Sequence, residues 1–463
     1  MVAAWPRRKR LAALCSGGEG RWGRWSLLSS PEEVVRIGLD EPDPLGQMAA
    51  RLEATALCGA GTSVEGAGEV PFAGGWMVAI GYELGGVIEP AARGRGGAAL
   101  VDPAWPWAIV MWRCPWAHVH DHAEGRWWTV GSGAPRMSLE RGDVEGRGCE
   151  LRGLRSVEGR ERFEDGVARI VEYIRAGDVF QANLSHRLMG TFDGSPRTLF
   201  VNMLDRARPW YGSYLEAPAE CGEHFVCGMS PELFLRYEAL ARRVTTRPIK
   251  GTRRGGSDPR VLRESVKDQA ELNMIVDLMR NDLGRVAEFG SVKVAEGRVI
   301  EEHGGGEATE RRSDGATKRG SDGGSVLHGV ATVTGTLRAG LGISDLLRAT
   351  FPGGSITGAP KVRAMQIIAE IEGRARGLYT GAVGFISDCG NMSLNIAIRT
   401  AVVRAGAGAP GGEIDAASGA EVQYSVGAGI VADSRPREEW DETMDKARAM
   451  MGLAAGAAQG ARR

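Results

Sequence analysis

The chain has 463 residues, of which 43% are hydrophobic and 25% are charged, a composition typical of a folded globular protein of two or three domains. The formal net charge of −1 gives no overall field that would favour nucleic acid or an anionic membrane as a partner. No window of about 18 apolar residues occurs, and the first residues lack the pattern of a signal peptide, so we expect no membrane segment.

The seven cysteines are scattered along the chain and form no CxxC pair. An odd count without metal-ligand spacing favours reduced thiols and a cytoplasmic location over disulfides or a zinc site. His118, His120 and His122 alternate with other residues and could bind a metal. The same alternation is typical of a strand with one face in water, and we favour this interpretation.

Short apolar runs before residue 131 predict antiparallel strands with one or two helices, because turn residues separate them. These runs cover 25–28, 75–82, 105–112 and 127–130. Residues 131–160 are rich in Gly and Arg, and they mark the expected boundary between a region 1–145 and a larger region 155–455.

After residue 160 the pattern predicts helices mixed with strands, which favours an α+β fold over a doubly wound sheet. Helical spacing of apolar residues predicts helices over 160–176, 264–289, 344–349, 361–373 and 435–453, the last capped by Ser434. Strands are expected over 179–188, 224–228, 232–237, 292–294, 330–337, 381–386, 392–403 and 422–430. The Gly-rich segments 303–325 and 405–420 are expected to be loops, the second between two strands.

Two acidic residues on separate predicted helices form a candidate magnesium site. Glu271 lies at the edge of an apolar helical stripe, and Glu442 lies on the last helix. Converging carboxylates make an all-oxygen site that suits Mg²⁺, which also keeps waters and accepts a substrate oxygen. Ordinary surface acids bonded to Lys267 or Lys446 are the alternative, and spacing alone favours that alternative.

A Gly-rich turn at 351–361 opens a predicted helix and is a candidate anion site. Its backbone N–H groups and the hydroxyls of Ser355 and Thr357 could bind a carboxylate or a phosphate, although a plain tight turn is an equal alternative. Arg399 is a charge inside an apolar predicted strand, where arginine usually meets a carboxylate of the protein or of a ligand. Tyr379 could add a hydroxyl or belong to the core.

Lys250 lies in the run Arg-Pro-Ile-Lys-Gly-Thr, where a predicted strand runs into a turn. Glu232 starts a strand that is expected to pair with the strand leading to Lys250. An acid that faces a lysine across a cleft supplies a proton donor and a nucleophile, provided that the surroundings lower the pKa of the lysine. A weak surface pair of the two side chains is the alternative.

Taken together, these segments resemble the chorismate-utilising enzymes, which include component I of anthranilate synthase and of aminodeoxychorismate synthase. The resemblance covers residues 160–453 in the family's order and is weaker before them. The matching segments are GDVFQANLSHR (177–187), SPELFL (230–235), RPIKGT (247–252), KDQAELNMIVDLMRNDLGRV (267–286), HGVATVTGTL (328–337), FPGGSITGAPKVRAM (351–365), YTGAVGF (379–385), NIAIRT (395–400) and GAGIVADSRPREEWDET (427–443), with GRWSLL (23–28), PFAGGWMVAIGYELG (71–85) and DPAWPW (102–107) before them.

The resemblance implies a fold of large antiparallel sheets packed as a sandwich with helices outside. It also implies that Glu271 and Glu442 hold Mg²⁺ against a carboxylate of chorismate, that Glu232 protonates the departing 4-hydroxyl and that His328 flanks the ring. The residues that it implies for substrate binding are Arg399, Tyr379, Ser355, Thr357, Gly358, Gly427 and Lys446.

Two positions separate the reactions within the family. Lys250 stands where para-aminating members carry a nucleophilic lysine and ortho-aminating members carry alanine. Gln181 stands where isochorismate and salicylate synthases carry a lysine that activates water, a role that an amide cannot perform. The resemblance therefore implies aminodeoxychorismate synthase component I, in para-aminobenzoate and folate synthesis, with anthranilate synthase component I of tryptophan synthesis as the alternative.

The source of ammonia is expected to be a separate glutamine amidotransferase subunit, or free ammonium, because the sequence contains no GxCxG nucleophile elbow. The segment 303–325 replaces the family's short link before His328, and we interpret it as an insertion rather than a lid. A catalytically inactive regulatory subunit is a third hypothesis, which the intact acids disfavour. Some family members hold tryptophan in the region that matches residues 25–28.

Overall fold

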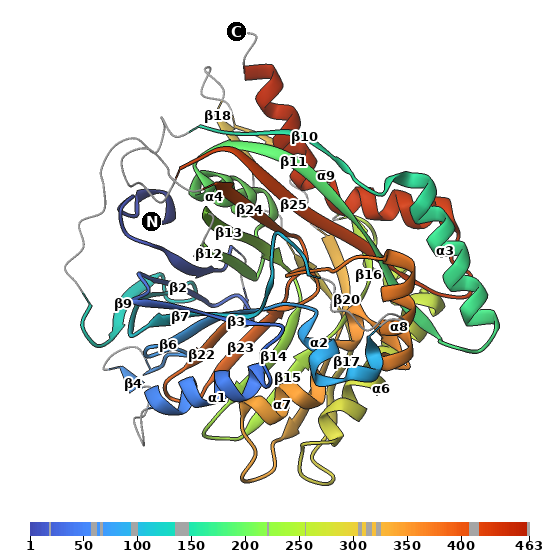
Figure 1. Cartoon of the computed structure of the whole chain (residues 1–463), viewed down its shortest axis with the longest axis horizontal. Helices are drawn as coiled ribbons and strands as arrows, with labels where there is room; N and C mark the ends of the chain where they lie inside the picture. The colour runs from blue at the N-terminus through green and yellow to red at the C-terminus, as the bar shows by residue number, and fades with distance from the viewer. Residues whose placement is uncertain are drawn as a thin grey trace.

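The strands of the protein form two large antiparallel sheets, and the helices lie around them (Figure 1). The computed structural model describes residues 1–17, 20–56, 63–64, 68–93, 101–134, 148–219, 222–254, 256–303, 308–311, 317–320, 326–406 and 416–460. Within these ranges, no helix is long and apolar enough to cross a lipid bilayer.

The first sheet has eleven strands among the described residues. In order across the sheet they are β10 (Cys149–Ser156), β11 (Gln181–Gly194), β25 (Ala417–Ile430), β24 (Thr400–Gly406), β13 (Gly222–Ser230), β12 (Tyr211–Ala219), β1 (Ala12–Cys15), β2 (Trp25–Ser29), β8 (Trp116–Asp121) and β9 (Arg126–Gly131), while β21 (Gly358–Ala359) pairs with β11 at the side.

The second sheet has ten strands in the described part of the chain. In order they are β16 (Ile249–Arg254), β20 (Val326–Thr336), β15 (Arg243–Arg247), β14 (Leu233–Glu238), β23 (Met392–Ile396), β22 (Ala382–Ser387), β6 (Gly75–Ile80), β7 (Trp107–Cys114) and β3 (Glu33–Gly38), while β17 (Lys293–His303) pairs with β20. Both sheets contain strands from 1–145 and from 155–455, and the division between these two regions stays a prediction.

Two short hairpins lie outside the large sheets. One joins β4 (Ser63–Val64) to β5 (Gly68–Glu69), and the other joins β18 (Ala308–Arg311) to β19 (Thr317–Gly320). The second hairpin lies within 303–325, so the expectation of a segment without strands is wrong where that segment is described. Most of 405–420 lies outside the described residues, but its ends belong to β24 and β25, which pair with each other as expected of a connection between two strands.

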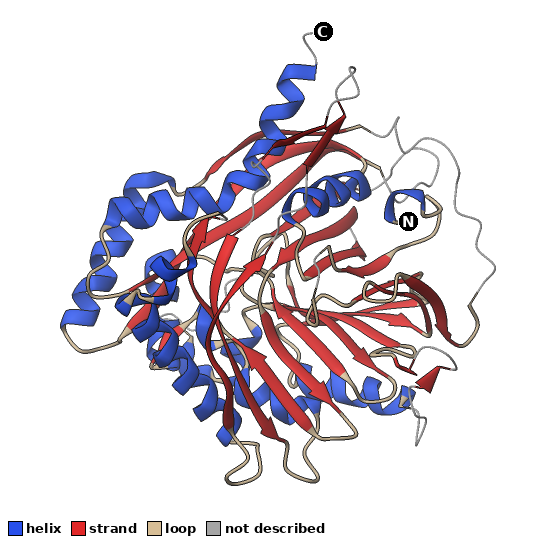
Figure 2. Cartoon of the chain, turned by 180° about the vertical axis from the view of Figure 1, so that it is seen from behind, coloured by secondary structure: helices blue, strands red, loops and turns tan. Residues whose placement is uncertain are grey.

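The helices cover the outer faces of the two sheets, as the helices in blue and the strands in red show in Figure 2. Those packed on the eleven-stranded sheet are α3 (Gly159–Arg175), α4 (Pro196–Ala207), α8 (Lys361–Glu372) and α9 (Pro436–Gly460). Those packed on the ten-stranded sheet are α1 (Pro44–Thr55), α2 (Leu84–Ile88), α6 (Val266–Gly284) and α7 (Ile343–Thr350), with α5 (Pro259–Arg263) beside α6. Three single 3-10 turns cover Val2–Ala4, Pro90–Ala92 and Gly354–Ile356.

The predicted helix over 264–289 is confirmed as α6, although it is shorter than expected at both ends. It begins at Val266, because the Ser265 side chain accepts a hydrogen bond from the Asp268 N–H, and it ends at Gly284. The predicted cap at Ser434 is wrong, because its hydroxyl accepts from the Val431 N–H and donates to Glu439 at 2.6 Å.

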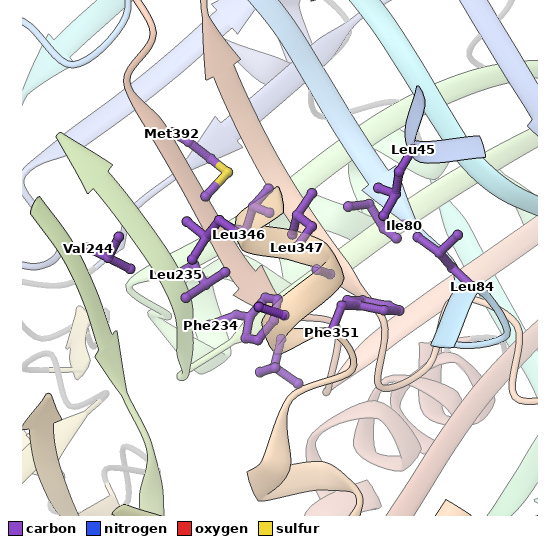
Figure 3. Close-up of a cluster of buried hydrophobic side chains, with 14 of the residues drawn as sticks. Leu45, Ile80, Leu84, Phe234, Leu235, Val244, Leu346, Leu347, Phe351 and Met392 are labelled. Carbon is purple, nitrogen blue, oxygen red and sulfur yellow. The ribbon is translucent and has the colours of Figure 1, made fainter. Parts of the chain in front are cut away.

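Four clusters of buried apolar side chains hold the layers together in the described part of the chain. One lies between the sheets, where Met77 and Val110 of one sheet meet Leu215 and Val402 of the other. A second packs α9 and α4 on the eleven-stranded sheet. A third packs α7 on the other sheet and includes Phe351 (Figure 3). A fourth packs α3 and α8 on the eleven-stranded sheet. This sandwich with outer helices confirms the expected fold class.

The predicted strand over 392–403 is wrong, because the chain changes sheets within it. β23 belongs to the ten-stranded sheet, and β24 belongs to the eleven-stranded sheet. Arg399 lies in the break between them with a φ of 52°, a left-handed conformation that is uncommon for a residue other than glycine. The run contains neither Gly nor Pro, so no local signal marks the crossing.

Candidate active site

Lys250 lies on β16, where a bulge bends the strand toward α6. It stands opposite Gly329 of β20, and the register shifts before the next pair, Thr252 with His328. Gly251 has a φ of 80°, and a β-carbon there would lie 2.7 Å from the Leu262 side chain. Only glycine permits both this conformation and this close approach.

The amine of Lys250 points to a place where three strands meet. A β-carbon on Gly429 of β25 would lie 2.9 Å from Lys250 Nζ and 2.3 Å from Gln181 Nε2 of β11. The two nitrogens therefore share the space over one glycine. The amine of Lys250 therefore lies beside the side-chain amide of Gln181.

Burial lowers the pKa of Lys250, and the ammonium group of Lys446 lowers it further, while the carboxylate of Glu271 raises it. The side chain is partly exposed. A lowered pKa increases the fraction of neutral amine near pH 7, which is the form that attacks an electrophile.

Glu232 is a buried acid directly before β14, with a side-chain environment that favours its neutral form. Its backbone N–H donates to Ser230 Oγ at 3.2 Å, and its carbonyl accepts from the Ile396 N–H at 3.1 Å and from Ser230 Oγ at 3.5 Å. Burial raises the pKa of Glu232 to about 7, although the Ser355 hydroxyl and the charge of Lys250 oppose the rise. The expected pairing is confirmed, since Leu233 stands opposite Arg247 on β15.

His328 lies on β20, one residue from the glycine that pairs with Lys250. Only 2% of it is exposed, and its Nδ1 is 3.0 Å from Thr252 Oγ1. Thr252 therefore fixes the orientation of the ring on the strand that carries Lys250. Sequence reasoning did not name Thr252, although it is the last residue of the motif quoted around the lysine.

Glu271 on α6 and Glu442 on α9 lie close enough for the charge of Glu442 to act on Glu271. Burial raises the pKa of Glu271, and the charge of Glu442 adds to that rise. Glu442 has a side chain that is 57% exposed and lies 2.8 Å from Lys446, whose charge lowers its pKa. Lys267 pairs with Asp433 at 3.5 Å.

The donor set of these two acids fits Mg²⁺ in part. Carboxylate oxygens are the ligands that this ion prefers, and one or two of them suffice when water and substrate supply the rest. In the described ranges, no group of three or more His, Cys, Asp or Glu side chains is arranged to hold a metal. An ion bound by Glu271 and Glu442 would thus need oxygens from a substrate, and Lys446 would have to release Glu442.

Arg399 is a partly buried cation without a carboxylate partner among the described residues. Burial lowers its pKa, and Tyr424 is the only group that opposes this effect within the described part of the chain. Its own carbonyl accepts from the Met229 N–H at 3.0 Å, which anchors the left-handed residue. A guanidinium held in this way needs an anion, and a ligand carboxylate would supply one.

Tyr379 and Gly427 are in contact. A β-carbon on Gly427 would lie 2.8 Å from Tyr379 Oη and 3.1 Å from Asn183 Oδ1. Lys446 Nζ donates to the Gly427 carbonyl at 2.8 Å, so this lysine binds a backbone carbonyl as well as the carboxylate of Glu442. The absence of a side chain at Gly427 lets the phenol and the amide approach the backbone of β25 closely.

The Gly-rich turn differs from the expectation that both of its hydroxyls face an anion. Thr357 Oγ1 donates to the Gly353 carbonyl at 2.9 Å inside the turn, whereas Ser355 faces Glu232. Gly358 has a φ of 147°, and a β-carbon there would lie 2.0 Å from the Gln181 carbonyl. The backbone of the turn therefore packs closely against β11.

Other features that the sequence suggested lie apart from this group. His118 and His120 point from β8 with partial exposure between buried neighbours, which confirms a strand with one wet face.

A cavity of about 220 Å³ lies elsewhere and contains none of the site residues predicted from the sequence; its lining includes Trp22, Trp25 and Tyr211. The described cysteines are free thiols, namely Cys15, Cys114, Cys149, Cys227 and Cys389.

Comparison with protein families gives a match over most of the chain. The family described as chorismate binding enzyme matches residues 24–305 and 321–452. The residues between these two ranges lie within 303–325, the segment interpreted as an insertion.

Two kinds of curated relative are similar to this chain. Anthranilate synthase component 1 of Aquifex aeolicus is 42% identical over 63% of this chain and 52% of its own length, and that of Pseudomonas aeruginosa is 39% identical over 68% and 57%. The chain thus matches little more than half the length of these two relatives. Aminodeoxychorismate synthase component 1 of Escherichia coli is 35% identical over 82% of this chain and 76% of its own.

Solved structures have the same fold. Anthranilate synthase component I of Streptococcus pneumoniae superposes with a TM-score of 0.71 at 26% identity, over 94% of this chain and 93% of that one. The menaquinone-specific isochorismate synthase of Escherichia coli gives a TM-score of 0.64 at 15% identity, over 98% and 91%.

Proposed function

Because the chain belongs to the family of chorismate binding enzymes, we propose that it converts chorismate and ammonia to 4-amino-4-deoxychorismate, as aminodeoxychorismate synthase component 1 does. The observation that carries the proposal is the amine of Lys250, which lies beside Gln181 over Gly429. A nearby acid, Glu232, has a pKa of about 7. A nucleophile and a proton donor are the two groups that this substitution needs.

In the proposed reaction the neutral amine of Lys250 attacks ring C2 of chorismate. The two ring double bonds shift, the C4–O bond breaks, and Glu232 donates its proton so that the 4-hydroxyl leaves as water. Ammonia then forms a bond to C4, the double bonds shift back, and the C2–N bond to Lys250 breaks. Each bond formed is matched by one broken, and no oxidant or reductant is needed.

Other side chains would bind and orient the two carboxylates of the substrate. Arg399 offers a guanidinium without a protein carboxylate among the described residues, and Tyr379 offers a hydroxyl over Gly427. Glu271 and Glu442 would hold Mg²⁺, which when bound would neutralise and orient a substrate carboxylate. His328, fixed by Thr252, would pack beside the ring.

We further propose that ammonia comes from a glutamine amidotransferase subunit or from free ammonium, since the chain has no glutaminase nucleophile motif. A cytoplasmic location stays a prediction from the scattered cysteines.

Anthranilate synthase component 1 remains the second candidate, because the anthranilate synthase relatives of Aquifex aeolicus and Pseudomonas aeruginosa reach higher identity than the aminodeoxychorismate synthase of Escherichia coli. The lysine at 250 argues against it. In that reaction ammonia adds at C2, which is the position that Lys250 would occupy.

Substitution of the nucleophile tests the proposal. We expect Lys250→Ala to lower turnover of chorismate with ammonium and Mg²⁺ by about a hundredfold or more. Lys267→Ala is the matched control, because Lys267 is a half-exposed lysine on α6 that pairs with Asp433, and it should retain most of the activity. Intact-mass measurement after chorismate without ammonium should show an adduct on the wild type and none on Lys250→Ala. Unchanged turnover in Lys250→Ala would reject the role of the amine.

A further inference from the structure

Arg376 is an almost fully buried cation directly behind the candidate chorismate site, and no motif in the sequence drew attention to it. It lies after α8, four residues from Glu372, and its side chain is 1% exposed. Nε donates to Glu372 Oε2 at 3.0 Å and Nη2 donates to Oε1 at 2.6 Å, so both carboxylate oxygens are bound. The charge is thereby neutralised inside the protein.

The remaining donors of Arg376 reach the backbone of two segments that line the site. Nη1 donates to the Ile356 carbonyl of the Gly-rich turn at 3.2 Å, and Nη2 donates to the Asn183 carbonyl of β11 at 2.6 Å. The Asn183 N–H donates in turn to the Thr357 carbonyl at 2.8 Å. One guanidinium therefore bridges the turn and the strand at the point where they touch.

A third segment, Tyr379–Thr380, is held by the same group. Arg376 Nη1 lies 3.3 Å from Thr380 Oγ1, and the guanidinium carbon is 5.9 Å from the ring centroid of Tyr379 and 4.8 Å from that of Tyr82. Cations at such distances are attracted to the faces of aromatic rings. The phenol of Tyr379 is the group whose hydroxyl faces the space over Gly427.

We propose that Arg376 is a positioning residue that sets the affinity for the carboxylates of chorismate, by holding the Gly-rich turn, β11 and Tyr379 together from behind. The planar fork of arginine binds two carboxylate oxygens and two carbonyls at once. Lysine keeps the charge but offers a single ammonium group, so it cannot reproduce this set of contacts. The inference rests on the proposed function only in taking chorismate as the ligand.

A second buried pair provides a matched control for the loss of a structural arginine. Arg197 and Glu216 have side chains that are both 0% exposed, with Nε 2.8 Å from Oε1. Arg197 also donates to backbone carbonyls, those of Trp5 at 2.8 Å and Lys9 at 2.9 Å. These contacts fasten the start of the chain to α4, and none of the proposed site residues takes part in them.

The experiment compares Arg376→Lys with Arg197→Lys below their unfolding temperatures. The dissociation constant for chorismate is measured by calorimetry with Mg²⁺ and without ammonium. We expect Arg376→Lys to bind chorismate about tenfold more weakly and Arg197→Lys to bind within about twofold of the wild type. Equal affinities in both folded variants would overturn the inference, since a purely structural arginine leaves binding unchanged.

Should Arg376→Lys fail to fold, Glu372→Gln is the variant to measure. This substitution keeps the size of side chain 372 and weakens its hydrogen bonds to Arg376. We expect chorismate to bind at least about threefold more weakly to this variant. Unchanged binding by a folded Glu372→Gln would overturn the inference. A wild-type protein that binds chorismate and forms anthranilate would refute the proposed function and leave this inference intact.

Discussion

The amine of Lys250 lies directly over the α-carbon of Gly429, so that a β-carbon there would be 2.9 Å from Nζ. Because the same β-carbon would lie 2.3 Å from Gln181 Nε2, an alanine must displace the amide, the amine or both. We expect Gly429→Ala to lower kcat by about tenfold or more, since a small misplacement of a reacting group is costly.

The control for this substitution is Gly335→Ala on β20. A methyl group there would meet Ala287 and Val292 at 3.4 Å, an ordinary contact. Both variants should remain folded by circular dichroism. Full activity in Gly429→Ala would mean that neither nitrogen needs its present position.

The pKa of Glu232, raised to about 7, gives the reaction a pH dependence. Glu232 donates a proton only in its neutral form, so the rate should fall as the pH rises above about 7. Glu232→Gln cannot donate this proton and should lose most activity. Its residual rate should no longer fall in that range, and a kcat profile against pH for both proteins checks this. If kcat of the variant declined with pH in the same way, a group other than Glu232 would cause the decline.

The same burial predicts a pH-dependent stability. The pKa of Glu232 is higher in the folded state than the ordinary 4.5, so its contribution to stability is complete below about 4.5 and is lost as the pH rises through about 7. The full difference corresponds to about 3 kcal/mol. Denaturant unfolding at about pH 5 and pH 8 should therefore show Glu232→Gln gaining stability over the wild type only at the higher pH. An equal gain in stability at both pH values would contradict the raised pKa of Glu232.

We expect the charge of Arg399 to lower the stability of the folded protein and to increase its affinity for chorismate. Its guanidinium has no carboxylate partner among the described residues, and burial already lowers its pKa. Arg399→Met removes the charge and keeps a long side chain at the same left-handed position. We expect Tm to rise by about 1–2 °C, while the dissociation constant for chorismate increases by about tenfold to a hundredfold.

Thermal unfolding and calorimetry measure these two quantities for Arg399→Met. A lower Tm together with unchanged affinity would mean that the arginine has a structural partner and no ligand.

The metal assignment is tested by Glu271→Gln. Loss of one carboxylate ligand should raise the Mg²⁺ concentration for half-maximal activity by about tenfold or more. It should also weaken Mg²⁺ binding measured by calorimetry with chorismate present. Asp277→Asn is the control on the same helix, because Asp277 pairs with Arg280 at 2.8 Å and its side chain is 71% exposed. Identical metal titrations for the two variants would remove Glu271 from the site.

Local patterns were sufficient where a residue's role depends on its own strand or helix. The pairing of the strand after Glu232 with β15 could be predicted, because it is a contact between neighbours in sequence. The prediction that Lys250 lies where a strand runs into a turn is wrong, since Pro248 separates β15 from β16 and Lys250 is the second residue of β16.

Contacts between distant segments could not be predicted in this way. Gln181, Lys250 and Gly429 meet because three strands from different parts of the chain converge, and no periodicity encodes that meeting. Arg399 was placed inside a strand since its apolar neighbours continue without Gly or Pro, although the chain crosses between sheets there. Arg376 drew no attention, because a charge in a short polar segment is usually exposed.

The product formed from chorismate tests the central claim most directly. The purified chain is incubated with chorismate, Mg²⁺ and ¹⁵N-labelled ammonium without any added lyase, and the product is identified by mass spectrometry and NMR. The account predicts 4-amino-4-deoxychorismate with the label at C4, and no product from Lys250→Ala. Fluorescent anthranilate, with the label at C2, would contradict it.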